Sequence, residues 1–304
     1  MSSTTPNSIN STEYPTDSID YRTTDGFNMR LIAQGAESRV YVKQIPINAT
    51  EYAKYKQHCT QYKLDINEIT PAGSTENGKN MNSECIVQCV IKQRFQKKYR
   101  HPLLDTKLNT THSRNELRAI DKLIQYYNVH RNNPSTTKHT YNLHQFVVPY
   151  VFNVPYTNTH QYTICMQYLT QFTTLKQYID SLNNSTQYNT LYTVCQQLGE
   201  LLSWIHSIGI IHGDLTTSNI MIESGSTSPR LTLIDYGLSS ISHTVENKSV
   251  DLYVLQRTFN ASHPHIAEQS FISVLKGYRT HDNDKVLSRL AVVQQRGRKR
   301  SMVG

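Results

Sequence analysis

The sequence feature that most constrains the fold is a polar loop followed by two short apolar runs. Asp214 and Asn219 lie five positions apart, and the apolar runs 220–222 and 231–234 lead to Asp235. The two runs predict neighbouring strands, which carry Asp235 back beside the loop. Phosphoryl transfer from ATP needs a carboxylate that accepts the proton of the attacking hydroxyl, and two further oxygen ligands that hold magnesium against the phosphates. We therefore predict that Asp214 is the catalytic base and that Asn219 and Asp235 are magnesium ligands.

Each of these residues has a simpler interpretation, because Asp, Asn and Gly are the usual residues of turns. One of them alone would favour a turn, but three in this order and spacing favour a catalytic loop. Two neighbouring features argue against a protein kinase regulated by phosphorylation. Gly213 stands where such kinases carry the arginine of His-Arg-Asp, and thirteen residues separate Gly237 from Asp251, with no Ala-Pro-Glu following. We expect a truncated activation segment that phosphorylation does not switch.

Length and composition are typical of an intracellular globular protein. The chain has 304 residues, of which 37% are hydrophobic, enough for one sizeable core or two small lobes. No apolar run reaches about 18 residues, and the N-terminus lacks the basic and apolar regions of a secretory signal. The five cysteines are an odd number without a Cys-x-x-Cys pair, which is typical of free thiols in a reducing compartment. We expect no membrane span and no zinc site, since His58, Cys59, Cys85 and Cys89 match no zinc spacing.

The first half of the chain predicts a small β-rich lobe over 27–169. Residues 1–26 are rich in Ser, Thr and Asn, and we expect them to form a disordered extension. The segment 32–42 predicts strand, turn and strand, where a kinase covers the ATP phosphates, although with one glycine a plain hairpin turn is the alternative. The polar segments 43–84 and 130–141 are interpreted as insertions, and we expect the first to lie on the surface. The turn residues that we expect to contact nucleotide are Gln34, Gly35, Ala36 and Glu37.

A lysine and a glutamate of this lobe predict an ion pair. The strand 89–92 ends at Lys92, where a kinase lysine holds the phosphates. Glu116 lies in the first turn of a predicted helix over 113–127, whose apolar stripe would pack on the sheet. Ser113 and Glu116 also form a capping-box pattern, in which Glu116 binds backbone donors instead. We favour the pair with Lys92, because kinases use a glutamate on the sheet-facing helix for this purpose.

The second half predicts a mainly helical lobe over 170–293, behind a short hinge. Strands at 146–154 and 162–166 lead into the hinge, where we expect Met166, Gln167 and Leu169 to hold adenine mainly through backbone groups. Helices are predicted at 174–182 and along the apolar stripe 191–205, which delivers the chain to the catalytic loop.

Positive charge gathers in two clusters. The formal charge is +8, from 31 basic and 23 acidic residues, and it is densest at 92–100 and 296–300. Such runs are commonly solvated surfaces, yet two dense clusters on a net-basic chain are also typical of nucleic-acid binding. The charges of the second cluster are too closely spaced for one helix face, so we expect 294–304 to be a mobile basic tail that contacts nucleic acid or the chain's own nucleotide site.

Several segments together resemble one family. The segments 212–219, 233–239, 250–255 and 296–304 read His-Gly-Asp-Leu-Thr-Thr-Ser-Asn, Leu-Ile-Asp-Tyr-Gly-Leu-Ser, Val-Asp-Leu-Tyr-Val-Leu and Arg-Gly-Arg-Lys-Arg-Ser-Met-Val-Gly. They are similar to the PRPK-type atypical kinase and ATPase subunits of the KEOPS (EKC) tRNA-modifying complex, as are 34–37, 91–95 and 99–102. The resemblance implies an α+β, two-lobed protein-kinase-like fold with a small β-rich N-lobe, a reduced, mainly helical C-lobe and a truncated activation segment. Tyr236 and Gln167 depart from the family pattern, which usually has phenylalanine and glutamate there.

The resemblance also implies cofactors and partners. ATP and Mg²⁺ would be the cofactors, and serine/threonine (auto)kinase or ATPase activity would support the formation of threonylcarbamoyladenosine in tRNA. The C-lobe would dock the threonylcarbamoyl-transferring subunit and the N-lobe a small regulatory subunit, in the cytoplasm and nucleus. The basic patch at 92–100 and the C-terminal tail would contact tRNA. Asp251 would anchor the catalytic loop, although an acid at a helix N-terminus is an equally good interpretation.

Two other functions were weighed against this one. A small-molecule phosphotransferase of the aminoglycoside-kinase type also carries His-Gly-Asp, but the residues 238–304 are few for the helical substrate region of those enzymes. A non-catalytic scaffold with a kinase shape is disfavoured, because the lysine and all three polar residues of the loop motif are present.

Overall fold

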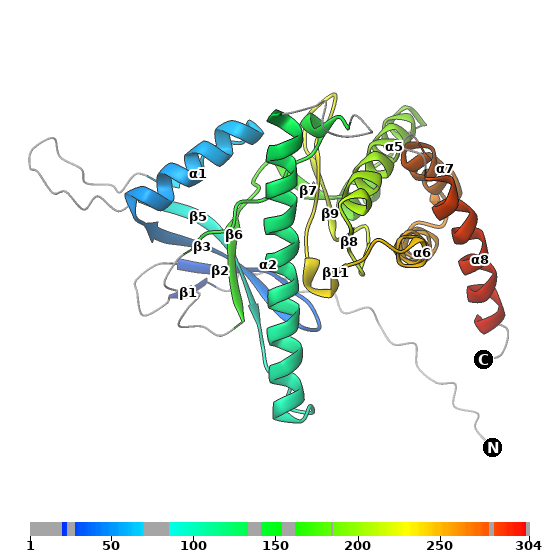
Figure 1. Ribbon diagram of the computed structural model, residues 1–304. Coiled ribbons are helices and arrows are strands. Elements are labelled where there is room, and N and C mark those ends of the chain that lie inside the picture. Colours follow the sequence, from blue (N-terminus) through cyan, green and yellow to red (C-terminus); the bar gives the residue numbers. More distant parts are fainter. Residues whose placement is uncertain are drawn as a thin grey trace, which may run out of the picture.

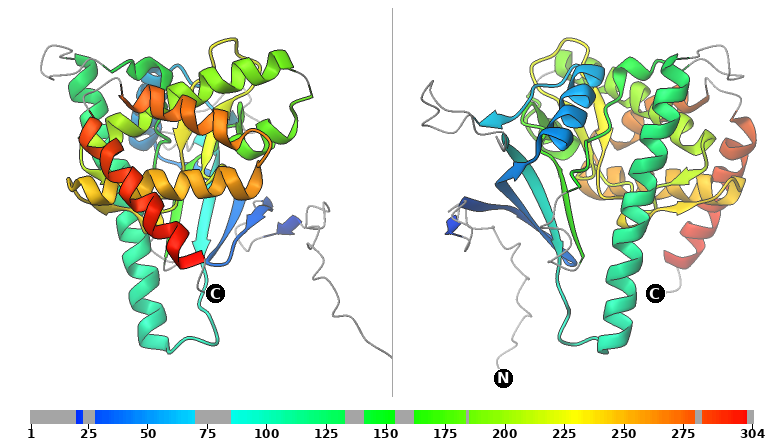
Figure 2. Two further views of the ribbon diagram at one scale, coloured as in Figure 1. Left: turned by 90° about the vertical axis from the view of Figure 1, so that its right-hand side faces the viewer. Right: turned by 60° about the vertical axis from the view of Figure 1, so that its left-hand side comes forward.

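A sheet-rich lobe and a helical lobe make up the described part of the chain (Figure 1). The computed structural model describes residues 20–22, 28–69, 85–132, 141–153, 162–183, 185–279 and 283–301. In Figure 1 the long helix α2 stands between the sheet and the helices of the second lobe. Figure 2 shows that the helices of the second lobe pack against one another. This arrangement confirms the predicted two-lobed α+β fold with a small β-rich N-lobe and a mainly helical C-lobe.

The sheet of the N-lobe is antiparallel and is built around one central strand. Its order is β1-β2-β3-β5-β4, and β6 also pairs with β5. Lys92 on β5 is in register with Val40 on β3 and with Ile164 on β6. Alternate β5 side chains enter the core, as expected of a half-buried strand, which leaves Lys92 and Arg94 together on the other face. The strands are β1 (Asp20–Arg22), β2 (Asn28–Gln34), β3 (Ser38–Ile47), β4 (Glu68–Ile69), β5 (Cys85–Arg94) and β6 (Thr163–Gln167).

Strand β1 lies within the segment 1–26 that we expected to be disordered. It pairs antiparallel with β2, with Asp20 opposite Arg30. The expectation was wrong for residues 20–22, because pairing with β2 gives their backbone groups partners that a polar composition does not reveal. The other residues of this segment lie outside the described part of the chain.

The segment 43–84, which we interpreted as a surface insertion, supplies part of the N-lobe core. Strand β3 continues to Ile47, and helix α1 (Ala49–Tyr62) follows. The side chain of Asn48 starts the helix by accepting a hydrogen bond from the N–H of Glu51 at 2.9 Å. Tyr55 and Cys59 on α1 are completely buried in the same core cluster as side chains of β5 and β6. The surface prediction was therefore wrong, because the polar residues of this segment lie on the outer side of a helix; residues 70–84 lie outside the described residues.

Helix α2 (Pro102–Asn132) is much longer than the predicted helix over 113–127. It begins at a proline, which suits the first helical turn. Glu116 therefore lies inside the helix, and its proposed capping box with Ser113 is wrong. The helix also includes the first residues of the predicted insertion 130–141, and residues 133–140 are not described.

The chain between α2 and the hinge is less regular than predicted. The 3-10 helix η2 (Leu143–Gln145) comes first. Residues 146–154 were expected to form a strand, but within 146–153 only single β-bridges occur, from Phe146 to Leu231 and from Val151 to Met166. Phe146 is nevertheless 2% exposed, because the segment packs between the two lobes' elements. Burial rather than strand pairing explains its apolar character.

The helices of the C-lobe follow the predicted order. Helix α4 (Leu175–Asp180) begins with a capping box between Thr174 and Gln177, and α5 (Ser185–Ser207) covers the predicted apolar stripe. Helices α5 and α7 (Ala267–Arg279) cross at Gly199 and Gly277, where an added Cβ would lie 2.0 Å and 1.9 Å from backbone carbonyl oxygens of the other helix. The other elements are α6 (Val245–Ser262), α8 (Asp284–Ser301), η3 (Tyr236–Leu238), β7 (Phe172–Thr174), β8 (Ile210–Ile211), β9 (Ile220–Glu223), β10 (Leu231–Leu233) and β11 (Ser240–Ile241).

The predicted mobile tail at 294–304 is helical through Ser301, as the end of α8. The prediction was wrong for these residues, because α8 packs along α6 and because Glu246 on α6 pairs with both Arg289 and Arg296. Residues 302–304 lie outside the described part. Among the helices that the structure describes, none has the length and apolar character needed to cross a membrane.

Candidate functional site

The catalytic loop brings together the three polar residues that the motif predicts. Strands β9 and β10 pair antiparallel, and the N–H of Ile234 donates to the carbonyl oxygen of Asn219 at 2.9 Å. Asp235, the next residue, is thereby carried back beside the loop, as predicted. The side-chain amide of Asn219 donates to the carboxylate and to the backbone carbonyl of Asp214, both at 3.0 Å. Asn219 therefore orients Asp214 in addition to presenting its own oxygen.

Lys92 joins this loop to the N-lobe. Its ammonium Nζ lies 2.7 Å and 2.9 Å from the two carboxylate oxygens of Glu116, and 2.7 Å from Oδ1 of Asp235. Lys92 is 4% exposed and Glu116 is completely buried, so both charges depend on each other for compensation. The predicted pair between strand and helix is therefore present, although Glu116 comes from the middle of α2.

Asp235 is held charged in an uncommon backbone conformation. Its partial burial alone would raise its pKa, but the charge and hydrogen bond of Lys92 and the charge of Arg94 outweigh this and hold the pKa below its usual value. Its φ of +62° lies in the left-handed region, which few residues other than glycine adopt, and its Oδ1 accepts from the N–H of Gly237 at 3.4 Å. Such strain is typical of functional positions, because the surrounding structure has to maintain it.

Asp251 fixes the backbone of the catalytic loop from below. Its two carboxylate oxygens accept the N–H groups of His212 and Gly213, each at 2.8 Å. His206 Nε2 lies 3.1 Å from the same carboxylate, and Nδ1 of this ring lies 2.8 Å from the hydroxyl of Tyr278. Burial alone would raise the pKa of Asp251, but His206 and the loop N–H of His212 hold it below its usual value. The alternative of an acid at a helix N-terminus is excluded, since α6 begins at Val245.

Gly213 has a structural reason to be glycine. Its φ is +81°, and an added Cβ would lie 2.4 Å from the carbonyl oxygen of Leu238. Both the left-handed conformation and the close approach of η3 therefore require the absence of a side chain. The sequence motif alone indicates only that a regulatory arginine is missing at this position.

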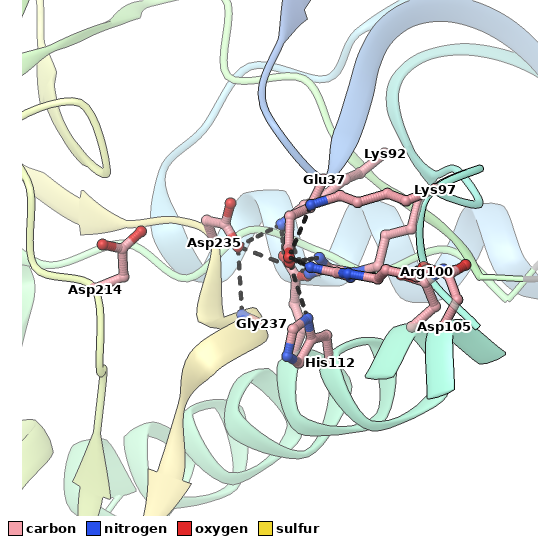
Figure 3. A network of polar contacts seen from close by, with 12 residues as sticks. Glu37, Lys92, Lys97, Arg100, Asp105, His112, Asp214, Asp235 and Gly237 are labelled. Atoms are coloured by element: carbon pink, nitrogen blue, oxygen red, sulfur yellow. Dashed lines mark hydrogen bonds and ion pairs between the residues drawn. The ribbon is translucent and has the colours of Figure 1, made fainter. Parts of the chain in front are cut away.

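The glycine turn between β2 and β3 is fastened to α2 through Glu37. Figure 3 shows the Glu37 carboxylate surrounded by Lys97, Arg100 and His112, at 3.4 Å, 3.2 Å and 3.0 Å. Its partial burial would raise its pKa, but the hydrogen bond from Arg100 and the charges of His112 and Lys97 outweigh burial and lower the pKa of Glu37. Gln34, Gly35 and Ala36 are exposed at this turn. Glu37 thus holds the turn in place, and its contact with nucleotide stays a prediction.

The basic cluster 92–100 is largely used inside the N-lobe. Arg94 Nη2 donates to Glu116 at 2.9 Å and lies 3.8 Å from Asp235 Oδ1, with 4% of its side chain exposed. Lys97 and Arg100 both bond Glu37, and of the basic side chains here Lys98 is exposed. The prediction of a nucleic-acid patch is therefore wrong for Lys92 and Arg94, because both side chains are buried and pair with Glu116 and Asp235. Sequence reasoning missed Arg94 as a site residue, although its spacing of two from Lys92 on one strand places both on the same face.

The predicted hinge residues lie at the end of β6, since Met166 and Gln167 are its last two residues and Leu169 follows it. Met166 is half-buried and pairs in register with Val90, and Leu169 is 7% exposed. The side chain of Gln167 turns into the protein toward α1, where its Oε1 accepts from the N–H of Tyr150 at 3.3 Å and its Nε2 lies 3.4 Å from Cys59 Sγ. Gln167 could therefore contact a nucleotide only through its backbone. The replacement of the family's glutamate by glutamine thus affects the contact with α1 and not a side-chain contact with nucleotide.

A hollow of about 600 Å³ opens beside Asp214, between the catalytic loop and α6. Lys176, Ser218 and Arg257 line it together with Asp214. A group that approached through this hollow would reach the carboxylate that the motif predicts as the base. Asp214, Asn219 and Asp235 offer only oxygen ligands, which fits Mg²⁺ bound together with phosphate oxygens. The arrangement can thus neutralise phosphates with Lys92 and receive a proton at Asp214.

Comparison with known proteins identifies relatives for most of this structure. A protein kinase domain model matches residues 109–267. The EKC/KEOPS complex subunit bud32 of Dictyostelium discoideum is 35% identical over 220 residues, which cover 72% of this chain and 78% of that protein. The EKC/KEOPS complex subunit Tp53rkb of Mus musculus is 34% identical over 217 residues, which cover 71% and 80%. A solved structure titled "WaaP in complex with acyl carrier protein" matches 93% of this chain at 10% identity, with a TM-score of 0.36, too low to support an argument.

Proposed function

Because this chain belongs to the kinase-domain family of the EKC/KEOPS complex subunits bud32 and Tp53rkb, we propose that it is an ATP-dependent phosphotransferase or ATPase acting within such a complex. The observation that carries the proposal is the joint position of Lys92 and Asn219. Lys92 contacts Glu116 and Asp235, while Asn219 contacts Asp214. The ion pair of the N-lobe lysine and the proposed catalytic base Asp214 thus belong to one connected set of contacts, as phosphoryl transfer requires.

The proposed roles follow from the contacts. Asp214 accepts the proton of the attacking hydroxyl or water, and Asn219 holds its carboxylate in place. Lys92 binds nucleotide phosphates, and Glu116 keeps its ammonium directed at them. Asn219 and Asp235 would hold Mg²⁺, which supplies charge neutralisation for the phosphates when bound.

The nucleotide would lie between the glycine turn and the hinge. We propose that Gln34, Gly35, Ala36 and Glu37 form the edge of the phosphate site. Met166, Gln167 and Leu169 would hold adenine, with Gln167 using only its backbone because its side chain is buried against α1.

The finer assignments rest on the family resemblance. We propose serine/threonine autokinase activity or ATP hydrolysis that supports the formation of threonylcarbamoyladenosine in tRNA, in the cytoplasm and nucleus. The C-lobe would dock the threonylcarbamoyl-transferring subunit, and the N-lobe a small regulatory subunit. The end of α8 would contact tRNA through its basic residues.

The test is Asp214→Asn in the full chain, compared with Asp284→Asn as the control. Asp284 is 77% exposed at the start of α8, so the same loss of a carboxylate there is far from the loop. The amide at 214 keeps the volume but cannot take a proton, which costs about 100- to 10,000-fold in rate. ATP turnover and modification of tRNA by the reconstituted complex should both fall for Asp214→Asn alone, with nucleotide binding retained. Turnover within a few-fold of the wild type would reject Asp214 as the base.

A further inference from the structure

The segment 62–67, which follows α1, contacts the N-lobe sheet, the hinge and the C-lobe. Helix α1 ends at Tyr62, the next residue Lys63 turns the chain sharply with a φ of +51°, and the N–H of Leu64 donates to the carbonyl of Cys59 at 2.9 Å. This turn directs the following residues behind the hinge. We call residues 62–67 the brace.

Asn67 connects the brace to the N-lobe and to the hinge. Its carbonyl accepts from the N–H of Gln88 on β5 at 2.9 Å, and its own N–H donates to the hydroxyl of Tyr55 at 3.2 Å. With its backbone fixed in this way, its side-chain amide Nδ2 donates to the carbonyl oxygen of Tyr168. Tyr55 is completely buried and packs on Tyr150, so the anchor of Asn67 is rigid.

Arg230 connects the other end of the brace to the C-lobe. Its guanidinium donates to the carbonyl of Tyr62 and, at 3.2 Å, to that of Lys63. Glu223 at the end of β9 orients this guanidinium through Nε at 2.9 Å. Gln171, just after the hinge, also bonds Asp65. The brace is therefore attached on both sides of the hinge.

The hydrogen bond to the Tyr168 carbonyl also determines where the next N–H group, that of Leu169, points. A peptide unit is planar and trans, so its C=O and its N–H point in opposite directions. The carbonyl of Tyr168 and the N–H of Leu169 belong to one such unit. When Asn67 holds this carbonyl toward the brace, the N–H of Leu169 is directed away from the brace, where the proposed adenine site lies.

We propose that Asn67 is a positioning residue that orients the Leu169 N–H toward a ring nitrogen of ATP, and that Arg230 secures it by holding the brace to the C-lobe. This inference rests on the proposed function, since it assumes that the hinge binds adenine. The segment inserted between β3 and β5 thereby acts in nucleotide recognition without touching the nucleotide. Gln167 contributes to the same connection, because its buried side chain bonds α1 rather than the ligand.

The decisive experiment compares the binding of ATP and of an ATP analogue to the wild type and to Asn67→Asp. Aspartate keeps the size of asparagine but, when ionised, has no hydrogen to donate to the Tyr168 carbonyl. The analogue is 1-deaza-ATP, which lacks the ring nitrogen that accepts from the hinge. Asn260→Asp is the matched control, because Asn260 is exposed on α6 and acquires the same charge.

Binding of both nucleotides to the full chain is measured by calorimetry with magnesium present. One hydrogen bond accounts for about a five- to tenfold preference for ATP over the analogue in the wild type and in the control. In Asn67→Asp this preference should fall to about twofold or less. A general loss of packing would weaken both nucleotides alike and leave the ratio unchanged.

Hydrogen exchange of the peptide covering 165–171 gives a second measurement that needs no nucleotide. Asn67→Asp and Arg230→Ala should both exchange faster there than the wild type and the control. An unchanged nucleotide ratio in Asn67→Asp, or hinge exchange equal to the control in both variants, overturns the inference. A wild type that binds ATP but does not discriminate against the analogue also overturns it, while the proposed function stands. A wild type that binds no ATP overturns both.

Discussion

The ammonium of Lys92 lies 2.7 Å from the carboxylate of Asp235, as close as it lies to Glu116. One cation therefore links strand β5, helix α2 and the residue proposed to hold magnesium. Lys92 compensates the charge of Asp235 before any phosphate arrives. Asp235 is thus kept ionised, with its pKa below the usual value, as its proposed role at a magnesium site requires.

Replacing Asp235 by asparagine should weaken the use of magnesium more than the fold. The amide removes the charge that attracts the metal, and Lys92 keeps its partner Glu116. We expect ATP turnover to fall by about 100-fold and the magnesium concentration needed for half-maximal rate to rise. Turnover is measured against magnesium concentration at saturating ATP, with Asp284→Asn as the control. An unchanged magnesium dependence would remove Asp235 from the metal site.

Replacing Glu37 by glutamine should loosen the glycine turn. The neutral amide weakens the contacts with Lys97, Arg100 and His112, which are partly exposed, so stability should fall by less than about 1 kcal/mol. The KM for ATP should rise a few-fold while kcat changes little, because the turn is proposed to position phosphates and has no proposed part in proton transfer. Steady-state kinetics check this, with the exposed Glu268→Gln on α7 as the control. A kcat that falls as much as kcat/KM would contradict the positioning role.

His58 predicts a specific dependence of stability on pH. Burial lowers the pKa of His58 to about 4, although the carbonyl of Val148, 2.8 Å from Nε2, partly offsets the shift. In the unfolded chain the ring binds a proton near pH 6.5, whereas the folded chain stays neutral down to about pH 4. The unfolded state therefore holds more protons in this window, and folding stability should fall by up to about 3 kcal/mol as pH drops through it.

The measurement is urea unfolding of the wild type and His58→Gln at pH 7 and pH 4.5. Glutamine can still donate to Val148 but does not titrate. The wild type should lose more stability between the two conditions than the variant does. Equal losses would show that His58 is not the group responsible.

The basic end of α8 predicts a salt-dependent interaction with tRNA. Alanine at Arg298, Lys299 and Arg300 removes three charges and leaves Arg296, which pairs with Glu246. Each lost phosphate contact should reduce the slope of log affinity against log salt by about 0.7 to 0.9. Filter binding at several salt concentrations measures the slope, and tRNA modification by the complex should fall more than ATP turnover. The control is Lys285→Ala at the exposed start of α8, and a triple variant with the slope of this control would refute tRNA contact.

The loop could be predicted from local spacing, whereas elements that depend on long-range packing could not. Asp214 and Asn219 lie on one loop, and a short strand pair separates Asn219 from Asp235, so the proximity of the three residues follows from local chain geometry. The partner of Lys92 was also identified, because residue types on a strand and a helix restrict the choice. The start of that helix was placed too late, since residues 105–112 are mostly polar and interrupt the apolar stripe.

The brace could not be predicted in the same way. Tyr55 packs on Tyr150 and Asn67 bonds Tyr168, residues far apart in sequence. A polar segment with scattered tyrosines and one cysteine is compatible with both a surface loop and a buried helix. Whether the segment forms a surface loop or a buried helix depends on whether the rest of the fold offers an apolar surface on which it can pack. The clustering of basic residues at 92–100 was misleading for a similar reason, because the acids that pair with them come from the turn at Glu37 and from α2.

The contact between Gly213 and Leu238 limits how a chain of this kind can change. A single substitution cannot place an arginine beside Asp214, because any side chain at 213 meets the Leu238 carbonyl and an unfavourable φ. The backbone of residues 237–241 would have to move first. An arginine at position 213 therefore requires a different course of the backbone after Asp235, and such a change would also disturb the loop that carries Asp214.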